Sequence, residues 1–168
     1  METPDAVPPE SAGNVKATRA DWLTIARDLL ISEGVEQVKV LSIGARLGVS
    51  RSSFYWYFKS RKHLLDELLK EWEATNTRSI VAQCALPAAT ITEGVCNLFR
   101  CFVDDGIFNA RLDSAVREWS RRSGAVRRVV DQSDAARLGA IQAMFARHGY
   151  DEREAEIRGI RTAVFTEE

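Results

Sequence analysis

The stretch from Val38 to Leu65 constrains the fold of this chain most, because it reads as two short helices joined by a glycine turn. Val40, Ile43 and Leu47 fall at helical spacing and predict a first helix of about two turns. Gly48 follows, and glycine readily takes the left-handed conformation that ends a helix. A helix, a glycine-containing turn and a second helix make up the helix-turn-helix arrangement, in which the second helix enters the DNA major groove.

The second helix of this pair is expected from Arg51 to about Tyr57, with Ser50 as its N-cap. Phe54 and Phe58 lie four residues apart, so they form the natural core pair, and the aromatic residues between them must lie partly outside. Small polar and aromatic residues within a basic frame are typical of a DNA-facing helix. The predicted DNA contacts are Arg51, Ser52, Ser53, Tyr55, Trp56, Tyr57, Lys59, Arg61 and Lys62.

Two of these residues allow more than one interpretation. Arg51 could donate two hydrogen bonds to a guanine, worth about 1–3 kcal/mol of discrimination, or it could grip a phosphate. For Trp56 a packing role at the rim of the domain is favoured over a base contact.

The segment G-V-S-R-S-S-F-Y-W-Y-F-K-S-R-K-H-L-L resembles the signature of the TetR family of bacterial transcriptional regulators, and the resemblance extends from about Ala20 to Leu65. It implies that Tyr55 lies against DNA and that Tyr57 and Arg61 bind phosphates. It also implies that the start of the first helix touches the DNA backbone, where Arg19 is the candidate, although a solvated arginine is an equal alternative.

This chain departs from the family pattern in the first helix of the pair. Lys39 replaces the usual N-cap, Gly44 replaces the usual alanine, and Leu41 stands where a polar side chain often reaches DNA. The glycine costs about 1 kcal/mol relative to alanine, so a more pliable helix is expected. A base contact from this helix is not expected.

Charge is distributed unevenly along the 168 residues, whose net charge is −1. Residues 14–63 hold nine Lys/Arg against four Asp/Glu, a net of +5, whereas residues 64–168 hold fourteen against seventeen, a net of −3. A basic segment joined to an acidic remainder indicates one part for nucleic acid and another for a different task.

The chain shows no signs of secretion, membrane insertion or metal binding. Residues 1–15 are acidic and proline-rich and are expected to form a disordered tail, and no apolar run is long enough to span a membrane. Cys84, Cys96 and Cys101 have no metal-ligand spacing and fit buried apolar positions in a cytoplasmic protein better than a redox switch.

Periodicity predicts an all-α fold in which a helix-turn-helix DNA-binding domain at 16–63 precedes a helical effector-binding and dimerisation domain at 64–168. Besides the central pair, helices are expected at 18–33, from after Ser60 to about 82, from Thr90 or Thr92 to near Gly106, and at 109–122, 125–148 and 152–165. Family members usually continue for another long helix, so the second domain looks short. The residues expected to line an effector pocket are Phe99, Cys101, Phe102, Trp119 and Met144.

These features predict a transcriptional regulator, most simply a repressor that binds a palindromic DNA operator as a homodimer and responds to a small-molecule effector without a cofactor. The short second domain keeps an alternative open, namely a heterodimerising interaction module that binds DNA weakly. An enzyme is not expected, because the sequence shows no nucleophile arrangement, metal-ligand set or phosphate-binding loop.

Overall fold

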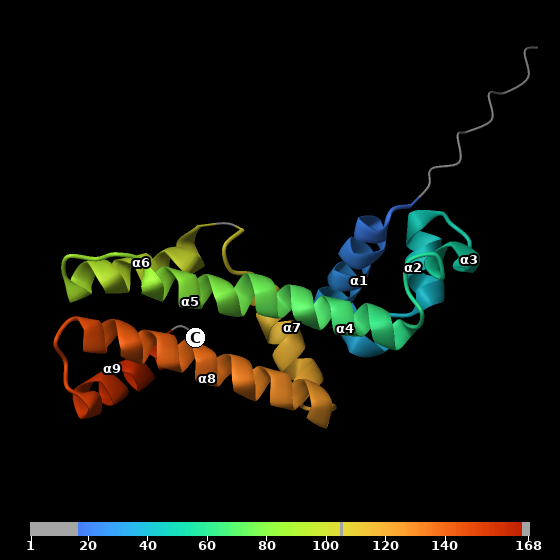
Figure 1. Cartoon of the computed structure of the whole chain (residues 1–168). Helices are drawn as coiled ribbons and strands as arrows, with labels where there is room; N and C mark the ends of the chain where they lie inside the picture. The colour runs from blue at the N-terminus through green and yellow to red at the C-terminus, as the bar shows by residue number, and fades with distance from the viewer. Residues whose placement is uncertain (1–16, 105, 166–168) are drawn as a thin grey trace, which may run out of the picture.

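The computed structural model describes residues 17–104 and 106–165, and every regular element within them is helical (Figure 1). The predicted tail at 1–15 lies outside the described residues. The elements in chain order are α1 (Arg19–Glu33), a 3₁₀ turn η1 (Val35–Gln37), α2 (Val40–Leu47), α3 (Arg51–Phe54), α4 (Arg61–Trp72), a π-helical segment η2 (Glu73–Thr77), α5 (Arg78–Ala85), α6 (Ile91–Val103), α7 (Ala110–Ser120), α8 (Gly124–Arg147) and α9 (Glu152–Phe165). The all-α prediction is confirmed.

Side-chain caps fix where several helices begin. Thr18 caps α1 and forms a capping box with Asp21, and Ser60 accepts a hydrogen bond from the backbone N–H of His63 at 3.1 Å at the start of α4. Thr90, rather than Thr92, caps α6. Ser50 occupies the N-cap position of α3, but its side chain accepts no capping hydrogen bond, so that part of the prediction is wrong.

The helical segment that follows Ser60 is longer than the sequence predicts, and its helical geometry changes along its length. Figure 1 shows α4, η2 and α5 as one continuous rod that ends at Ala85 rather than near 82. Its middle turn is π-helical, a wider turn that often occurs at functional sites. Asn76 and Thr77 are buried in this turn.

The π-helical turn connects to a buried network of polar side chains. Asp113 of α7 accepts hydrogen bonds from the indole N–H of Trp72 (2.7 Å) and from the guanidinium of Arg137 in α8 (2.9 Å). Arg137 also donates to the hydroxyl of Thr77 (3.2 Å), and Asn76 donates to Asp113 (3.3 Å). These contacts tie the rod to α7 and α8.

Two apolar cores lie on either side of this network. The first packs α1 to α4 against α7 and the first turns of α8, and its largest buried side chains include Trp22, Trp72, Phe54 and Phe58. The second lies among α5, α6, α8 and α9 and includes Leu98, Cys101, Ile141 and Met144. The first core therefore combines side chains from both sides of the predicted domain boundary at residue 63.

The three cysteines differ in environment. Cys84 and Cys101 are buried, and burial raises the pKa of each thiol to about 11, which keeps it protonated and unreactive. Cys96 is exposed on α6, so the expectation that all three are buried is wrong for this residue.

Candidate nucleic-acid interface

The turn between α2 and α3 is built as the sequence predicts. Gly48 has φ 66° and ψ 28°, the left-handed conformation that ends α2, and the backbone N–H of Val49 donates to the carbonyl of Gly44 at 3.0 Å. A side chain at Gly44 would meet this same turn, because a Cβ there would lie 3.2 Å from the Val49 carbonyl oxygen and 3.5 Å from the Trp22 ring. An alanine at this position would therefore press on the turn, whose backbone would have to shift by a few tenths of an ångström.

Helix α3 is anchored to the core by its phenylalanines. Phe54 is fully buried, with its ring centroid 5.2 Å from that of Trp22 and 5.3 Å from that of Phe58. The predicted core pair is confirmed. The helix ends at Phe54, earlier than the predicted Tyr57, and a turn carries the next three residues.

The residues opposite this anchor form an exposed surface. Tyr55 is 50% exposed and Trp56 is 72% exposed, whereas Tyr57 is half-buried against the core. Trp56 therefore does not pack at the rim of the domain, and that interpretation is wrong. Its indole is free to meet a partner such as the edge of a nucleic acid.

The side chain of Arg51 is ordered by its own helix. Its guanidinium donates a hydrogen bond to the Tyr55 hydroxyl at 3.0 Å and lies 5.8 Å from the Tyr55 ring centroid. Ser52 is exposed beside Arg51, and the hydroxyl of Ser53 donates to the Ser50 carbonyl at 2.8 Å. Arg51 and Tyr55 thus present one preorganised donor group on the exposed side of α3.

The basic residues after α3 differ in how they are held. Lys59 and Lys62 are exposed, and Lys62 pairs with Asp66 one turn along α4 at 2.7 Å. Arg61 is half-buried, and its guanidinium donates to the carbonyls of Val38 (2.6 Å) and Val35 (2.5 Å). Arg61 therefore holds η1 against the start of α4, a structural contact that the family resemblance did not imply.

Two further residues considered for DNA contact also have defined environments. Arg19 forms an ion pair with Glu67 and lies 5.3 Å from the Phe58 ring centroid, so it is not simply solvated. Leu41 is 67% exposed in the first turn of α2. The pairing of Arg19 leaves Arg51, Lys59 and Lys62 as the more accessible cations of this region.

The residues predicted to line an effector pocket are only partly brought together. Cys101 and Met144 are fully buried in the second core and Phe102 packs against it, whereas Phe99 is 38% exposed and its ring centroid lies 6.3 Å from that of Phe102. Phe102 lines two hollows beside Phe108, and Trp119 packs against the first core and lines a separate cavity next to α1. Periodicity identified the apolar stripe on each helix but could not show which helices face each other.

Other kinds of site find no support in the part of the chain that the structure describes. Within residues 17–104 and 106–165, no three His, Cys, Asp or Glu side chains lie together as metal ligands would. None of the described helices combines the length and apolar character needed to cross a membrane.

Comparisons with known proteins agree with this geometry. Residues 23–68 match the model of the bacterial regulatory proteins of the tetR family. The transcriptional repressor KstR2 of Mycobacterium tuberculosis, in strains CDC 1551 and H37Rv, is 30% identical over 79 residues, which cover 45% of this chain and 40% of the relative. The matched region thus spans less than half the length of these curated relatives.

One solved structure extends the likeness to most of the fold. The structure of SCO7518 from Streptomyces coelicolor A3(2), a protein provisionally assigned as a transcriptional regulator, superposes with a TM-score of 0.59 at 22% identity. The superposition covers 88% of this chain and 84% of that protein, and at this identity it shows a shared fold. Over its helix-turn-helix segment, the chain is therefore similar to the bacterial regulatory proteins of the tetR family.

Proposed function

We propose that this protein is a transcriptional regulator, most simply a repressor, that places α3 in the major groove of a DNA operator in the cytoplasm. The observation that carries the proposal is the exposed surface of α3 and the turn after it, where Arg51, Tyr55 and Trp56 face outward from the buried Phe54 and Phe58. Arg51 is the residue best placed to read a base, and Lys59 and Lys62 would contact phosphates. Tyr57 and Arg61 would support this surface from behind.

The operator would be palindromic and read by a homodimer, which places two copies of α3 about 34–36 Å apart along the DNA. Two exposed apolar residues on α9, Ile157 (49%) and Ile160 (46%), support a partner on this side of the molecule. A small-molecule effector would then change the spacing of the two α3 helices and so the affinity for the operator.

Fluorescence anisotropy with two labelled duplexes tests this proposal. One duplex comes from the DNA upstream of the protein's own gene, and the other has the same composition in scrambled order. The intact chain should prefer the first duplex by about a thousandfold or more, which is the lower end for specific binding. Equal binding to both would contradict the proposal, and binding that is both weak and equal would favour the heterodimerising alternative.

Two variants assign the role of Arg51 in the same assay. If Arg51 contacts a base, Arg51→Ala should reduce the preference between duplexes by about 5- to 150-fold, because a good bidentate contact is worth about 1–3 kcal/mol. If it contacts a phosphate, both affinities should fall equally. Arg128→Ala, which removes an exposed arginine from α8, serves as the matched control and should change neither.

A further inference from the structure

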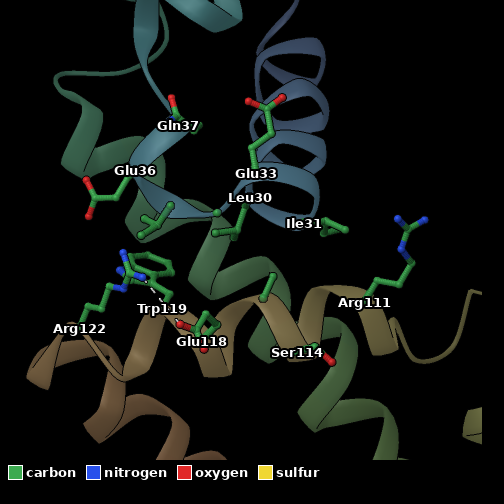
Figure 2. A pocket seen from close by; sticks show the side chains of 13 residues that line it. Leu30, Ile31, Glu33, Glu36, Gln37, Arg111, Ser114, Glu118, Trp119 and Arg122 are labelled. Atoms are coloured by element: carbon green, nitrogen blue, oxygen red, sulfur yellow. Dashed lines mark ion pairs between the residues drawn. The ribbon is translucent and has the colours of Figure 1, made fainter.

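A cavity of about 700 Å³ lies between the end of α1 with η1 on one side and α7 on the other. Its floor is apolar and is formed by Leu30, Ile31, Val35, Ala115 and Trp119, of which Leu30 and Val35 are buried in the first core (Figure 2). Binding sites for small molecules have volumes of about 300–1,000 Å³ and mostly apolar walls. The size and lining of this cavity suit an apolar small molecule.

Most charged groups around this cavity already have partners. Glu33 forms an ion pair with Arg46, and Glu118 is shared between Arg121 at 3.2 Å and Arg122 at 3.9 Å. Arg111 has no ion pair or hydrogen bond with any residue that the structure describes. An uncommitted guanidinium beside an apolar floor favours a ligand with one anionic group.

The position of Arg111 determines how such a ligand would be oriented in the cavity. Figure 2 shows Arg111 at one end of the cavity and Arg122, Glu36 and Trp119 toward the opposite end, with Leu30 and Ile31 between them. A ligand carboxylate beside Arg111 would therefore lie far from the carboxylate of Glu36. An apolar body behind the carboxylate would cover the floor.

One wall of the cavity is joined directly to the helix-turn-helix. Gly34, Val35 and Glu36 belong to this wall, and α2 begins a few residues later at Val40. Arg61 also clamps the carbonyl of Val35 to the start of α4. A molecule that pushes η1 away from α7 would thus move the elements that position α3.

We propose that this cavity binds a small amphipathic carboxylate, with its carboxylate at Arg111 and its apolar body on Leu30 and Trp119, and that its occupancy changes DNA affinity. The proposed binding site depends only on the cavity and its lining. The proposed change in DNA affinity rests on the proposed function.

Displacement of a fluorescent apolar anion, 8-anilinonaphthalene-1-sulfonate, from the full chain tests the binding site. Decanoate, decylammonium and decanol, which share one chain length, serve as competitors. Decanoate should displace the dye from a single site at a concentration at least tenfold lower than decylammonium, because only the carboxylate can accept from Arg111. Equal competition by decanoate and decylammonium would overturn the proposal.

Two variants locate the site without disturbing the core, since both positions are exposed. Arg111→Ala should weaken decanoate binding about tenfold or more through the lost charged contact. Ser114→Trp should weaken it similarly by filling the cavity. Arg128→Ala and Ala135→Trp make the same changes on exposed positions of α8 and should leave binding unchanged. If Arg111→Ala and Ser114→Trp bind decanoate as tightly as the intact chain, the cavity is not the site.

The coupling to DNA is measured separately, by adding decanoate to the upstream duplex and the intact chain. Saturating decanoate should shift the DNA affinity at least fivefold, the lower end of typical allosteric coupling, and Ser114→Trp should abolish that shift. If the protein binds DNA specifically but decanoate does not change its affinity, the regulatory part of this inference is wrong and the proposed function is unaffected. Absence of specific DNA binding in the ligand-free chain would instead count against the proposed function.

Discussion

Arg61 illustrates how one side chain can serve the fold where the sequence pattern suggests DNA. Its guanidinium donates to two backbone carbonyls, Val35 and Val38, that lie 26 and 23 residues earlier in the chain. Those carbonyls belong to η1 and the residue after it, so Arg61 fixes the entry to α2. Loss of this side chain would remove a charged donor from both carbonyls, although the Val35 carbonyl would keep its hydrogen bond from the backbone N–H of Val38 at 3.2 Å.

Arg61→Ala should lower the free energy of unfolding by about 2–3 kcal/mol, because two charge-assisted hydrogen bonds are lost. Lys62→Ala, at the neighbouring position, removes only an exposed ion pair and should change it by less than about 1 kcal/mol. Urea denaturation of both variants measures the difference. Equal destabilisation by the two would show that Arg61 does not hold η1.

Asp113 is a second residue whose replacement should strongly lower the free energy of unfolding. Burial alone would raise the pKa of Asp113, but Arg137 and Arg117 outweigh it and hold the pKa below its usual value. A carboxylate with a lowered pKa stabilises the fold fully above its unfolded pKa of about 4, and this stabilisation is lost as pH falls through the lower folded pKa. The protein should therefore lose stability in acid, from about pH 4 downward.

Asp113→Asn should cost about 3 kcal/mol at pH 7, because it leaves the buried guanidinium of Arg137 with only the longer ion pair to Asp134 at 3.7 Å. Urea midpoints at pH 7, 5 and 3 for the intact chain and the variant provide the measurement. The difference between the urea midpoints of the two proteins should be the same at pH 7 and pH 5 and smaller at pH 3. A gap that stays the same at pH 3 would mean that the carboxylate is not the stabilising form.

At the scale of elements, α2 is short and lacks a side-chain cap, and its packing compensates for both. Gly44 lets α2 approach Trp22 and the Val49 carbonyl, where a Cβ would lie 3.5 and 3.2 Å away respectively. The sequence predicts a pliable helix at this glycine. The structure adds that a methyl group there would press on the Val49 carbonyl, whereas it would make an ordinary van der Waals contact with the Trp22 ring.

Replacement of two glycines by alanine separates helix propensity from packing. Gly139→Ala in α8, where a Cβ would have nothing within 4 Å, should raise the free energy of unfolding by about 1 kcal/mol. Gly44→Ala should gain nothing or lose stability, because the new methyl group meets a backbone carbonyl. Thermal and urea unfolding of both variants tests this, and an equal gain at both positions would refute the packing role of Gly44.

The elements also show what sequence patterns can and cannot reveal. Local signals placed Thr18, Ser60 and Gly48 at helix ends, and the four-residue spacing of Phe54 and Phe58 identified the core pair. The π-helical turn at Glu73–Thr77 could not be predicted, because its buried side chains contact Asp113 and Arg137, which are distant in sequence.

The same limit applies to the candidate sites, where features within one segment could be predicted and contacts between distant segments could not. The exposed residues of α3 could be predicted, because a continuous aromatic run cannot be buried on one face of a helix. The contact of Arg61 with η1 and the cavity beside Trp119 depend on how α1, η1, α4 and α7 meet in space. The spacing of residues within a single helix does not show how separate helices pack against each other.

At the scale of the whole molecule, the DNA-facing elements and the helical remainder are joined by two connections. The rod formed by α4, η2 and α5 runs from one end of the molecule toward the other, and α7 packs against both α1 and α8 (Figure 1). The buried network around Asp113 fastens the rod to α7 and α8. A change in the second half of the chain can therefore reach α3 through packed helices.

If the surface around α3 binds duplex DNA, a salt series of binding to the upstream duplex should show it. Each phosphate contact should steepen the fall of log K with log salt concentration by about 0.9. Lys59→Ala combined with Lys62→Ala should reduce the slope by about two, and Arg127→Ala combined with Arg128→Ala, on the exposed side of α8, should leave it unchanged. A slope near zero for the intact chain, or an equal change in both double variants, would contradict the account.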